Sequence, residues 1–398
     1  MNFAKIINKS GLKIIILLCA YVHGNHIKIR QTQSQAIDPK NAYRNGHAVD
    51  EIKKIKMQEL GLQNATNSIN DFETTSSLTN HNKTKTYIDL INVTDSYFYG
   101  LIRVGNPPQE FRVAFDTGSS KIWIPGNECK SLSCLQHRMF DRNLSNSYVA
   151  ENSGLQIEYG AGKVEGKIGR DTIQLGPIKL NNTRFLHTEA QDHIFELPQT
   201  VFDGVFGLAI DPNKDEKLSP IHNIIDNLSI KQKLFTFELP KGHNSTGKLT
   251  FGEINQELYQ VNYSKAYGNS TSFTKRSNST ALLDTGTSFI LGDSWTINKL
   301  NKDMGVDVNT NRIECSAVKY LKPIKIVLDN RVFRLYPKDY ILKDKKNHAC
   351  YSAFMKKSDG PPLILGISFL SKFYSIFDID KQRVGLAPIE SKFKENIN

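Results

Sequence analysis

The sequence has no apolar run long enough to cross a membrane comfortably. Its most apolar run, residues 14–22, follows the basic residues Lys5, Lys9 and Lys13 and precedes Gly24. A basic start with a short apolar core is typical of a cleaved secretory signal peptide, whereas a transmembrane helix needs about 20 apolar residues. We therefore predict a signal peptide over residues 1–24, no stable membrane insertion, and a secreted, vacuolar or secretory-organelle protein. An uncleaved signal anchor is the alternative.

The sequence also lacks the ligand spacing of a metal site. Its ten histidines form no pattern such as His-Glu-x-x-His, so we predict no metal and no cofactor. Cysteine is scarce, and one of the five lies inside the predicted signal peptide. The remaining four are an even count in a secretory chain, which predicts two disulfides with three possible connectivities. The short loop favours Cys129–Cys134, which leaves Cys315–Cys350.

A clustered basic region is absent as well, although the formal net charge is +11. Because lysine and arginine are scattered, we interpret the charge as solvated surface and predict no nucleic-acid partner. Residues 25–85 are polar, with one amphipathic helical pattern over 50–62. This composition is consistent with either a disordered linker or a basic prosegment that covers a site whose working groups are carboxylates. From residue 86 onward, short alternating strands between turn residues predict an all-β protein.

One short motif occurs twice. Residues 115–120 read Phe-Asp-Thr-Gly-Ser-Ser, and residues 283–288 read Leu-Asp-Thr-Gly-Thr-Ser. Each copy follows an apolar run, which places an acid on a tight turn at the end of a buried strand. A single copy would suit an ordinary turn with an Asx hydrogen bond. The matched pair instead predicts that Asp116 and Asp284 meet at an interface between two lobes.

Two carboxylates a few ångströms apart cannot both ionise cheaply, so such a pair shares one proton over a wide pH range. The ionised member can take a proton from a water, and the protonated member can donate to a carbonyl oxygen. The flanking residues suit supporting roles, since glycines allow close backbone approach and hydroxyls can hydrogen-bond a carboxylate or reach across the interface. These residues are Thr117, Gly118, Ser119, Thr285, Gly286 and Thr287.

The doubled motif resembles that of the pepsin-like aspartic endopeptidases. The resemblance extends to the cysteine loop after the first motif, the hairpin sequence Tyr159-Gly160-Ala161-Gly162, and the glycine-interrupted strands 202–209 and 363–366. It covers residues from about 90 to 390, and the Asn-rich composition is most similar to the plasmepsins of apicomplexan parasites. The resemblance implies a bilobal all-β double barrel with a few short helices and a cleft for an extended peptide.

Residue roles follow from the same resemblance. It implies a catalytic pair, Asp116 and Asp284, and a flap and substrate-binding set comprising Tyr159, Gly160, Trp123, Phe202, Val205, Leu282 and Ile364. Two flap residues depart from the family pattern: Ala161 replaces a hydroxyl residue, and Lys163 replaces a small polar one. These changes put one substrate contact in doubt and favour polar or acidic substrate side chains near the lysine.

The implied organisation is an N-terminal lobe over 86–256 and a C-terminal lobe over 257–398, made as a zymogen whose prosegment, 25–85, inhibits it. The expected function is a secreted monomeric endopeptidase that cuts between bulky apolar residues. A catalytically silent binding protein of the same fold is the rival hypothesis. A retroviral-type protease is disfavoured, because such enzymes carry one motif per chain and dimerise.

Overall fold

The computed structural model describes residues 87–93, 95–159, 162–196, 200–210, 219–227, 232–242, 245–255, 264–267, 272–274, 280–328, 331–344, 348–357 and 363–389. By its contacts the chain divides into two units, Met1–His23 with Thr86–Asn398, and Gly24–Lys85. All described residues belong to the first unit. The predicted signal peptide, prosegment and helix over 50–62 lie outside the described residues, as does the predicted lobe boundary at 256–257.

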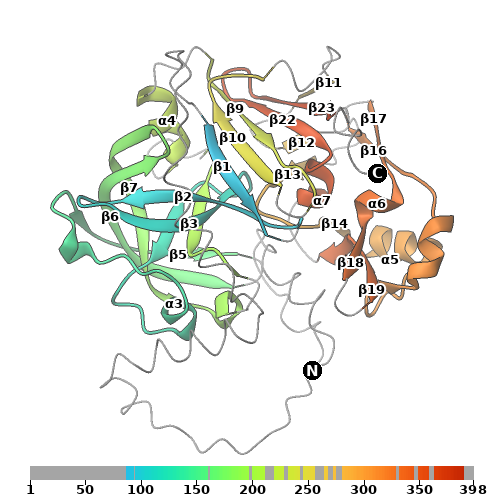
Figure 1. Cartoon of the computed structure of the whole chain (residues 1–398), viewed down its shortest axis with the longest axis horizontal. Helices are drawn as coiled ribbons and strands as arrows, with labels where there is room; N and C mark the ends of the chain where they lie inside the picture. Colours follow the sequence, from blue (N-terminus) through green and yellow to red (C-terminus); the bar gives the residue numbers. More distant parts are fainter. Residues whose placement is uncertain are drawn as a thin grey trace, which may run out of the picture. The chain divides into compact units, whose positions relative to one another are not determined.

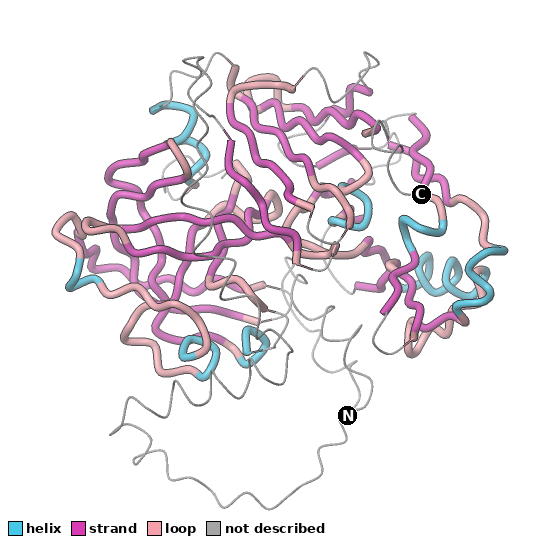
Figure 2. The backbone as a smooth tube through the Cα atoms, viewed as in Figure 1, coloured by secondary structure: helices cyan, strands magenta, loops and turns pink. Residues whose placement is uncertain are grey.

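Most of the described chain is β-structure (Figures 1 and 2). The largest sheet has the strand order β11 (Ser264–Tyr267), β23 (Arg383–Pro388), β22 (Phe373–Asp378), β9 (Leu234–Glu238), β10 (Thr246–Phe251), β1 (Tyr87–Asn92), β2 (Phe98–Val104), β3 (Gln109–Asp116), β8 (Gly204–Gly207), β4 (Ile122–Pro125), β7 (Ile178–Gln191), β6 (Lys163–Leu175) and β5 (Val149–Glu158). The all-β prediction is confirmed.

Three smaller sheets contain strands of the C-terminal half. One has the order β12 (Ser272–Thr274), β13 (Thr280–Leu283), β21 (Leu363–Leu365), β14 (Ile290–Asp293) and β20 (Phe354–Lys357). The second contains β15 (Arg312–Ile313), β19 (Ala349–Ser352) and β18 (Ile341–Asp344), and the third is the hairpin of β16 (Ile324–Leu328) and β17 (Arg331–Leu335).

The helices are short. They are α3 (Leu132–Leu135), α4 (Pro220–Asn227), α5 (Ser294–Asp303), α6 (Pro337–Tyr340) and α7 (Ile367–Leu370), with 3-10 turns η3 (Arg142–Leu144), η4 (His193–Glu196) and η6 (Cys315–Tyr320). Helix α5 is capped by the residue before it, because the Asp293 side chain accepts a hydrogen bond from the Thr296 N–H at 2.9 Å. Its apolar face buries Ile297. Within the described residues, no helix is long and apolar enough to span a membrane.

The largest sheet joins strands from opposite ends of the chain. Strand β22 pairs antiparallel with β9, and β9 pairs with β10, which in turn pairs with β1. Figure 1 shows this as red β22 beside yellow β9 and β10, with blue β1 on their other side. Strands on both sides of the predicted boundary at residues 256–257 therefore belong to one sheet, which holds the two halves together through backbone hydrogen bonds.

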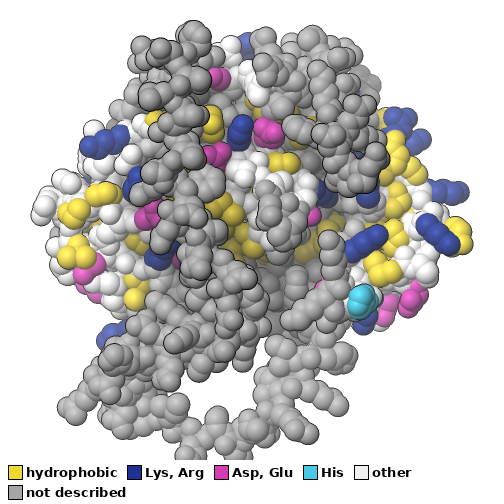
Figure 3. All heavy atoms as spheres, in the orientation of Figure 1, with side chains coloured by type: hydrophobic (Ala, Val, Ile, Leu, Met, Phe, Trp, Pro, Cys, Tyr) yellow, Lys and Arg dark blue, Asp and Glu magenta, His cyan; other side chains and the backbone are white. Residues whose placement is uncertain are grey.

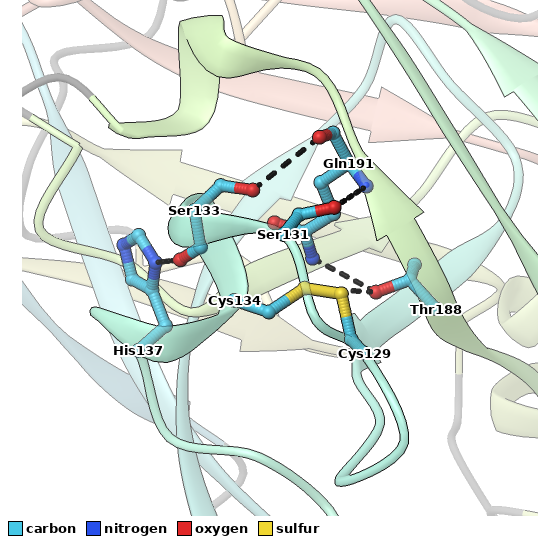
Figure 4. The surroundings of a disulfide bond; sticks show 7 residues. All are labelled: Cys129, Ser131, Ser133, Cys134, His137, Thr188 and Gln191. Carbon is cyan, nitrogen blue, oxygen red and sulfur yellow. Dashed lines mark hydrogen bonds between the residues drawn. A yellow bond between two sulfur atoms is a disulfide. The ribbon is translucent and has the colours of Figure 1, made fainter. Parts of the chain in front are cut away.

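Both predicted cysteine pairs form disulfides, with S–S distances of 2.04 Å for Cys129–Cys134 and 2.12 Å for Cys315–Cys350. The first closes a loop that packs on β7 (Figure 4). In that loop the Ser131 hydroxyl accepts from the Gln191 N–H at 3.1 Å. The two ring nitrogens of His137 lie 2.6 Å from the Ser133 carbonyl oxygen and 2.9 Å from that of Thr200. The loop is thus tied to the strand and to the segment preceding β8.

A second histidine is buried inside the N-terminal half. His187 of β7 is 2% exposed, and its Nε2 lies 2.8 Å from the Tyr148 hydroxyl. Burial lowers the pKa of His187, because the charged imidazolium would lose its hydration. The unfolded chain restores the ordinary pKa, near 6.5, so it binds protons more readily than the folded chain below that pH.

We therefore predict that His187 makes the fold less stable in acid. Its contribution to the free energy of unfolding is fully present above the unfolded pKa and is lost as pH falls through the lower folded pKa. In His187→Gln the unfolding free energy, measured with urea at several pH values, should fall less steeply toward acid than in the wild type. His193→Gln alters an exposed histidine and is the control. Equal slopes in His187→Gln and the wild type would contradict the prediction.

Candidate active site

The two copies of the motif occupy equivalent positions in their halves. Strand β3 buries Phe111, Val113 and Phe115 and ends at Asp116. Strand β13 buries Leu283 and ends one residue before Asp284. In each half the aspartate lies at the end of a strand whose apolar side chains are buried in the core, and this packing fixes the position of the carboxyl group.

The strand that pairs in parallel with each motif strand is also equivalent in the two halves. Strand β8 pairs parallel with β3, and β21 pairs parallel with β13. Each ends at or beside a glycine that lies against the motif loop. A Cβ on Gly207 would stand 2.6 Å from the Ser119 carbonyl oxygen, and one on Gly366 would stand 2.1 Å from that of Thr287. Because no side chain fits in that space, the apolar-glycine order repeated along the sequence is a packing requirement of the site.

The two motif turns are joined by a symmetric set of hydrogen bonds. The Thr117 N–H donates to the Thr285 hydroxyl oxygen, and the Thr285 N–H donates to the Thr117 hydroxyl oxygen, both at 3.0 Å. The Thr117 hydroxyl donates to the Leu283 carbonyl at 2.8 Å, and the Thr285 hydroxyl donates to the Phe115 carbonyl at 2.7 Å. Both threonines are buried, so the four bonds hold the halves in one register at the carboxyl pair.

Each carboxyl group accepts hydrogen bonds from its own turn. The Gly118 N–H donates to Asp116 Oδ1 at 2.8 Å, and the Gly286 N–H donates to Asp284 Oδ1 at 2.9 Å. The Ser119 hydroxyl donates to Asp116 Oδ2. These bonds orient both carboxyl groups, and the Gly286 bond favours the ionised form of Asp284.

The equivalent hydroxyl in the second turn is that of Thr287, which donates to Asp284 Oδ2 at 2.6 Å. A Cβ on Gly118 would stand 2.7 Å from both carboxyl oxygens of Asp284, so this glycine is what lets the first turn approach the second carboxyl group.

Burial opposes ionisation of Asp284. Asp116 is 1% exposed and Asp284 is 5% exposed. Burial, followed by the charge and the hydrogen bond of Asp116, raises the pKa of Asp284 well above its ordinary value. Asp284 therefore holds a proton at pH values at which an isolated aspartate would be ionised. A pair with one proton contains a base and an acid side by side.

The hairpin of β5 and β6 brings an aromatic side chain to this pair. Tyr159 follows β5 and is buried, and its hydroxyl accepts a hydrogen bond from Trp123 Nε1 at 2.7 Å. It also hydrogen-bonds Ser119, and burial raises its pKa, so the phenol stays neutral. Through Ser119 the hairpin is connected to the Asp116 carboxyl group. The predicted flap residues Gly160 and Ala161 lie outside the described residues.

Lys163, the unusual flap residue, has a partner within its own hairpin. Its Nζ lies 3.6 Å from Glu165 Oε2, and both side chains are about half exposed, at 46% and 48%. Its backbone N–H donates to Asp192 Oδ2 at 2.9 Å. The lysine charge is thus partly balanced by a neighbour two residues along the strand.

An apolar cluster surrounds Tyr159 and contains the predicted pocket residues Trp123, Phe202 and Val205. The Trp123 and Phe195 rings meet edge to face with centroids 5.3 Å apart. The cluster also contains residues that the sequence did not single out for the site, namely Tyr97, Ala114, Val164 and Leu186. The alternating pattern marks these only as buried strand positions, which does not separate a pocket wall from ordinary core.

Leu282 and Ile364 belong to a different environment. They are cross-strand partners on β13 and β21, and both are buried in the large core cluster and not in the cluster around Tyr159. They lie one register position behind Leu283 and Leu365, beside the second motif. The structure therefore brings together the two carboxyl groups, their supporting turns and four predicted residues, Trp123, Tyr159, Phe202 and Val205. Leu282 and Ile364 lie apart from these four, in the core beside the turn of the second motif.

Three serines beside the second turn were not expected. The Ser288 hydroxyl donates to the Ser96 carbonyl at 2.8 Å, and the Ser368 hydroxyl donates to the Ser288 carbonyl at 2.7 Å. Ser288 occupies the place in the second motif that Ser120 has in the first. That correspondence was visible in the sequence, but a partner 192 residues away was not. Among the described residues no group of three His, Cys, Asp or Glu side chains could hold a metal.

The threonine bonds predict a large loss of stability when one hydroxyl is removed. Thr117→Val leaves the Thr285 N–H and the Leu283 carbonyl without their buried partners, at a cost of about 1–3 kcal/mol for each group. Thr172→Val is the matched control, because that hydroxyl makes one exposed bond of 3.5 Å. Urea unfolding should show a clear loss for Thr117→Val and a loss within about 0.5 kcal/mol for the control. Similar losses in both variants would contradict the role of the interface bonds.

Comparison with known proteins agrees with this geometry. The family model described as eukaryotic aspartyl protease matches residues 97–389. Pepsin A of Sus scrofa is 32% identical over 323 residues, which cover 75% of this chain and 83% of that protein. Vacuolar protease A of Aspergillus fumigatus is 31% identical over 321 residues, covering 74% and 80%. Pregnancy-associated glycoprotein 2 of Bos taurus is 30% identical over 360 residues, covering 85% and 94%. With two matched motifs at one interface and a family match across nearly all described residues, the chain belongs to the eukaryotic aspartyl protease family.

Proposed function

We propose that the protein is an aspartic endopeptidase whose catalytic pair is Asp116 and Asp284. The observation that carries the proposal is the pair of buried carboxyl groups on equivalent turns, with the pKa of Asp284 raised well above its ordinary value by burial and by Asp116. Such a pair holds one proton between two carboxyl groups, which is the pattern of pKa splitting known for aspartic proteases. Hydrolysis by this pair uses no side-chain nucleophile.

The chemistry follows from the shared proton. The ionised carboxylate takes a proton from a water held between the two acids, and the water oxygen bonds to the carbonyl carbon of the peptide. The protonated carboxyl donates its proton to the carbonyl oxygen, which gives a neutral tetrahedral gem-diol. Collapse of this intermediate returns one hydroxyl proton to the carboxylate that had donated to the carbonyl oxygen, and the carboxyl group that took the water proton gives it to the leaving nitrogen as the C–N bond breaks. The pair ends with one proton, ready for another cycle.

The hydrogen bonds around the pair prepare it for these steps. The N–H groups of Gly118 and Gly286 and the hydroxyls of Ser119 and Thr287 hold the carboxyl groups in place before substrate arrives. Fixed dipoles of this kind need no reorganisation during the reaction. The Thr117 and Thr285 bonds keep the two turns at a constant separation.

The substrate is proposed to be an extended peptide with bulky apolar residues around the cut bond. The apolar cluster of Trp123, Phe202 and Val205 beside Tyr159 supports this preference, because it gathers large apolar side chains near Asp116. Leu282 and Ile364 are proposed to line the other side. Tyr159 and Gly160 are proposed to cover the bound peptide as a flap.

We further propose that the protein is made as a zymogen in the secretory pathway, with a signal peptide over 1–24 and an inhibitory prosegment over 25–85. The polar, basic composition of that segment supports it, since a cation can neutralise a carboxylate pair. The Asn-rich composition supports a narrower assignment, an apicomplexan plasmepsin that acts as a monomer.

The cleavage test uses the chain after removal of residues 25–85, with a fluorogenic peptide that has large apolar residues at its centre. Asp284→Asn should lower kcat/KM by roughly 10²- to 10⁴-fold or more, because the variant has lost its acid. A statine inhibitor, which mimics the tetrahedral state, should abolish wild-type cleavage. The chain that retains its prosegment should be far less active.

The matched control is Asp380→Asn, which neutralises an exposed carboxylate of the same half and should leave kcat/KM unchanged. Wild-type protein without detectable cleavage anywhere from about pH 3 to 7 would overturn the proposal and favour the silent binding protein. Cleavage that persists in Asp284→Asn would assign the activity to another site.

A further inference from the structure

The hairpin of β16 and β17 has two unlike faces. Its inner face buries Ile326, Leu328, Phe333 and Leu335. The Phe333 ring meets the Phe369 and Phe373 rings with centroids 5.9 and 5.4 Å apart. The hairpin is therefore fixed to the core of the C-terminal half, and its other face is directed outward as a rigid surface.

The outer face consists of two cross-strand pairs. Lys325 is paired with Arg334, and Val327 is paired with Val332. All four side chains are exposed, and the two valines are 46% and 47% exposed. We call these four residues the basic hairpin face. Two cations directly opposite one another repel, so the arrangement does not serve the stability of the hairpin itself.

The segment that enters the hairpin adds to the same character. Tyr320 is 76% exposed, and the Lys319 Nζ lies 4.9 Å from the centre of its ring. The Tyr340 hydroxyl of α6 donates to the Lys322 carbonyl at 2.8 Å, which holds this segment beside the element that follows β17. Figure 3 shows lysine and arginine side chains among exposed hydrophobic ones over this part of the molecule, on the right of the view.

Three cations of this region are in no ion pair among the described residues. Within the part of the chain that the structure describes, no ion pair involves Lys319, Lys325 or Arg334. The acidic residue of α6, Asp339, is buried and is paired with Lys372 instead. Within the described part of the chain, Lys319, Lys325 and Arg334 are therefore not neutralised by an ion pair.

We propose that the basic hairpin face binds the surface of an anionic lipid bilayer. The cations are complementary to acidic lipid headgroups, and the valines and Tyr320 can enter the apolar and interfacial layers beneath them. A nucleic acid would match the charge and leave the exposed valines without a partner. A bilayer can bind a flat face that has no cavity, because the binding depends on charge and apolar contact and not on a matching shape. Binding would place the protease on a membrane without insertion of a helix.

The test is cosedimentation of the purified chain with vesicles of phosphatidylcholine and phosphatidylserine in a ratio of about three to one, beside vesicles of phosphatidylcholine alone. The chain should sediment with the anionic vesicles and not with the neutral ones. Salt should weaken the binding, because it screens exposed charges. Each lysine or arginine near the surface contributes about fivefold in affinity, so Lys325→Glu/Arg334→Glu should weaken binding at least about 25-fold.

The matched control is Lys130→Glu/Lys179→Glu, which makes the same change in net charge at exposed positions of the N-terminal half. Its affinity should fall by less than about fivefold. Peptide cleavage in solution and the far-ultraviolet circular dichroism of both variants should match the wild type. Loss of vesicle binding is therefore separable from misfolding and from failure of the proposed protease activity.

Three results would overturn the proposal. The wild-type chain could fail to sediment with anionic vesicles, it could bind neutral vesicles equally well, or the control could lose as much affinity as the hairpin variant. Binding to immobilised polyglutamate without binding to vesicles would assign the face to an acidic polypeptide, and the bilayer would be ruled out.

Discussion

The site depends on one constraint, which is that two carboxyl groups are buried beside each other. Burial and the Asp116 charge keep a proton on Asp284, while hydrogen bonds from the turns stabilise the ionised form. The two effects on Asp284 oppose each other, and burial with the Asp116 charge prevails, so the pKa of Asp284 is raised. The threonine bonds hold the two turns in one register, which keeps the carboxyl groups beside each other.

The repeated motif made the geometry of the candidate site predictable from sequence, because the acid, hydroxyl and glycine of each turn make their contacts locally. Gly118 and Ser119 contact an aspartate in their own turn or its mate, so a short window of sequence contains most of the site. The all-β class followed from equally local patterns, the short alternating strands between turn residues. The pepsin-like resemblance extended this knowledge to Tyr159 and Trp123, which no local rule would have brought together.

Other features depend on contacts between distant segments, and sequence patterns do not specify them. Strand β22 pairs with β9 across the expected lobe boundary. The sequence contains many apolar strands, and their patterns do not specify which two will pair. The bond from Ser288 to Ser96 likewise links ordinary serines. The basic hairpin face was hidden by scattered charge along the chain, and it is evident only when β16 and β17 are placed in register. The buried His187 also looked like any other histidine until its strand was packed.

The shared proton can be tested most directly by the pH dependence of kcat/KM for a peptide substrate that carries no ionisable groups. The account predicts a bell-shaped profile, because activity requires one carboxyl group ionised and the other protonated, and the loss of either form ends catalysis. The descending limb should lie well above the ordinary aspartate range, as expected from the raised pKa of Asp284. A rate that rises with pH to a plateau, with no descending limb, would show that the doubly ionised pair is active and would contradict the account.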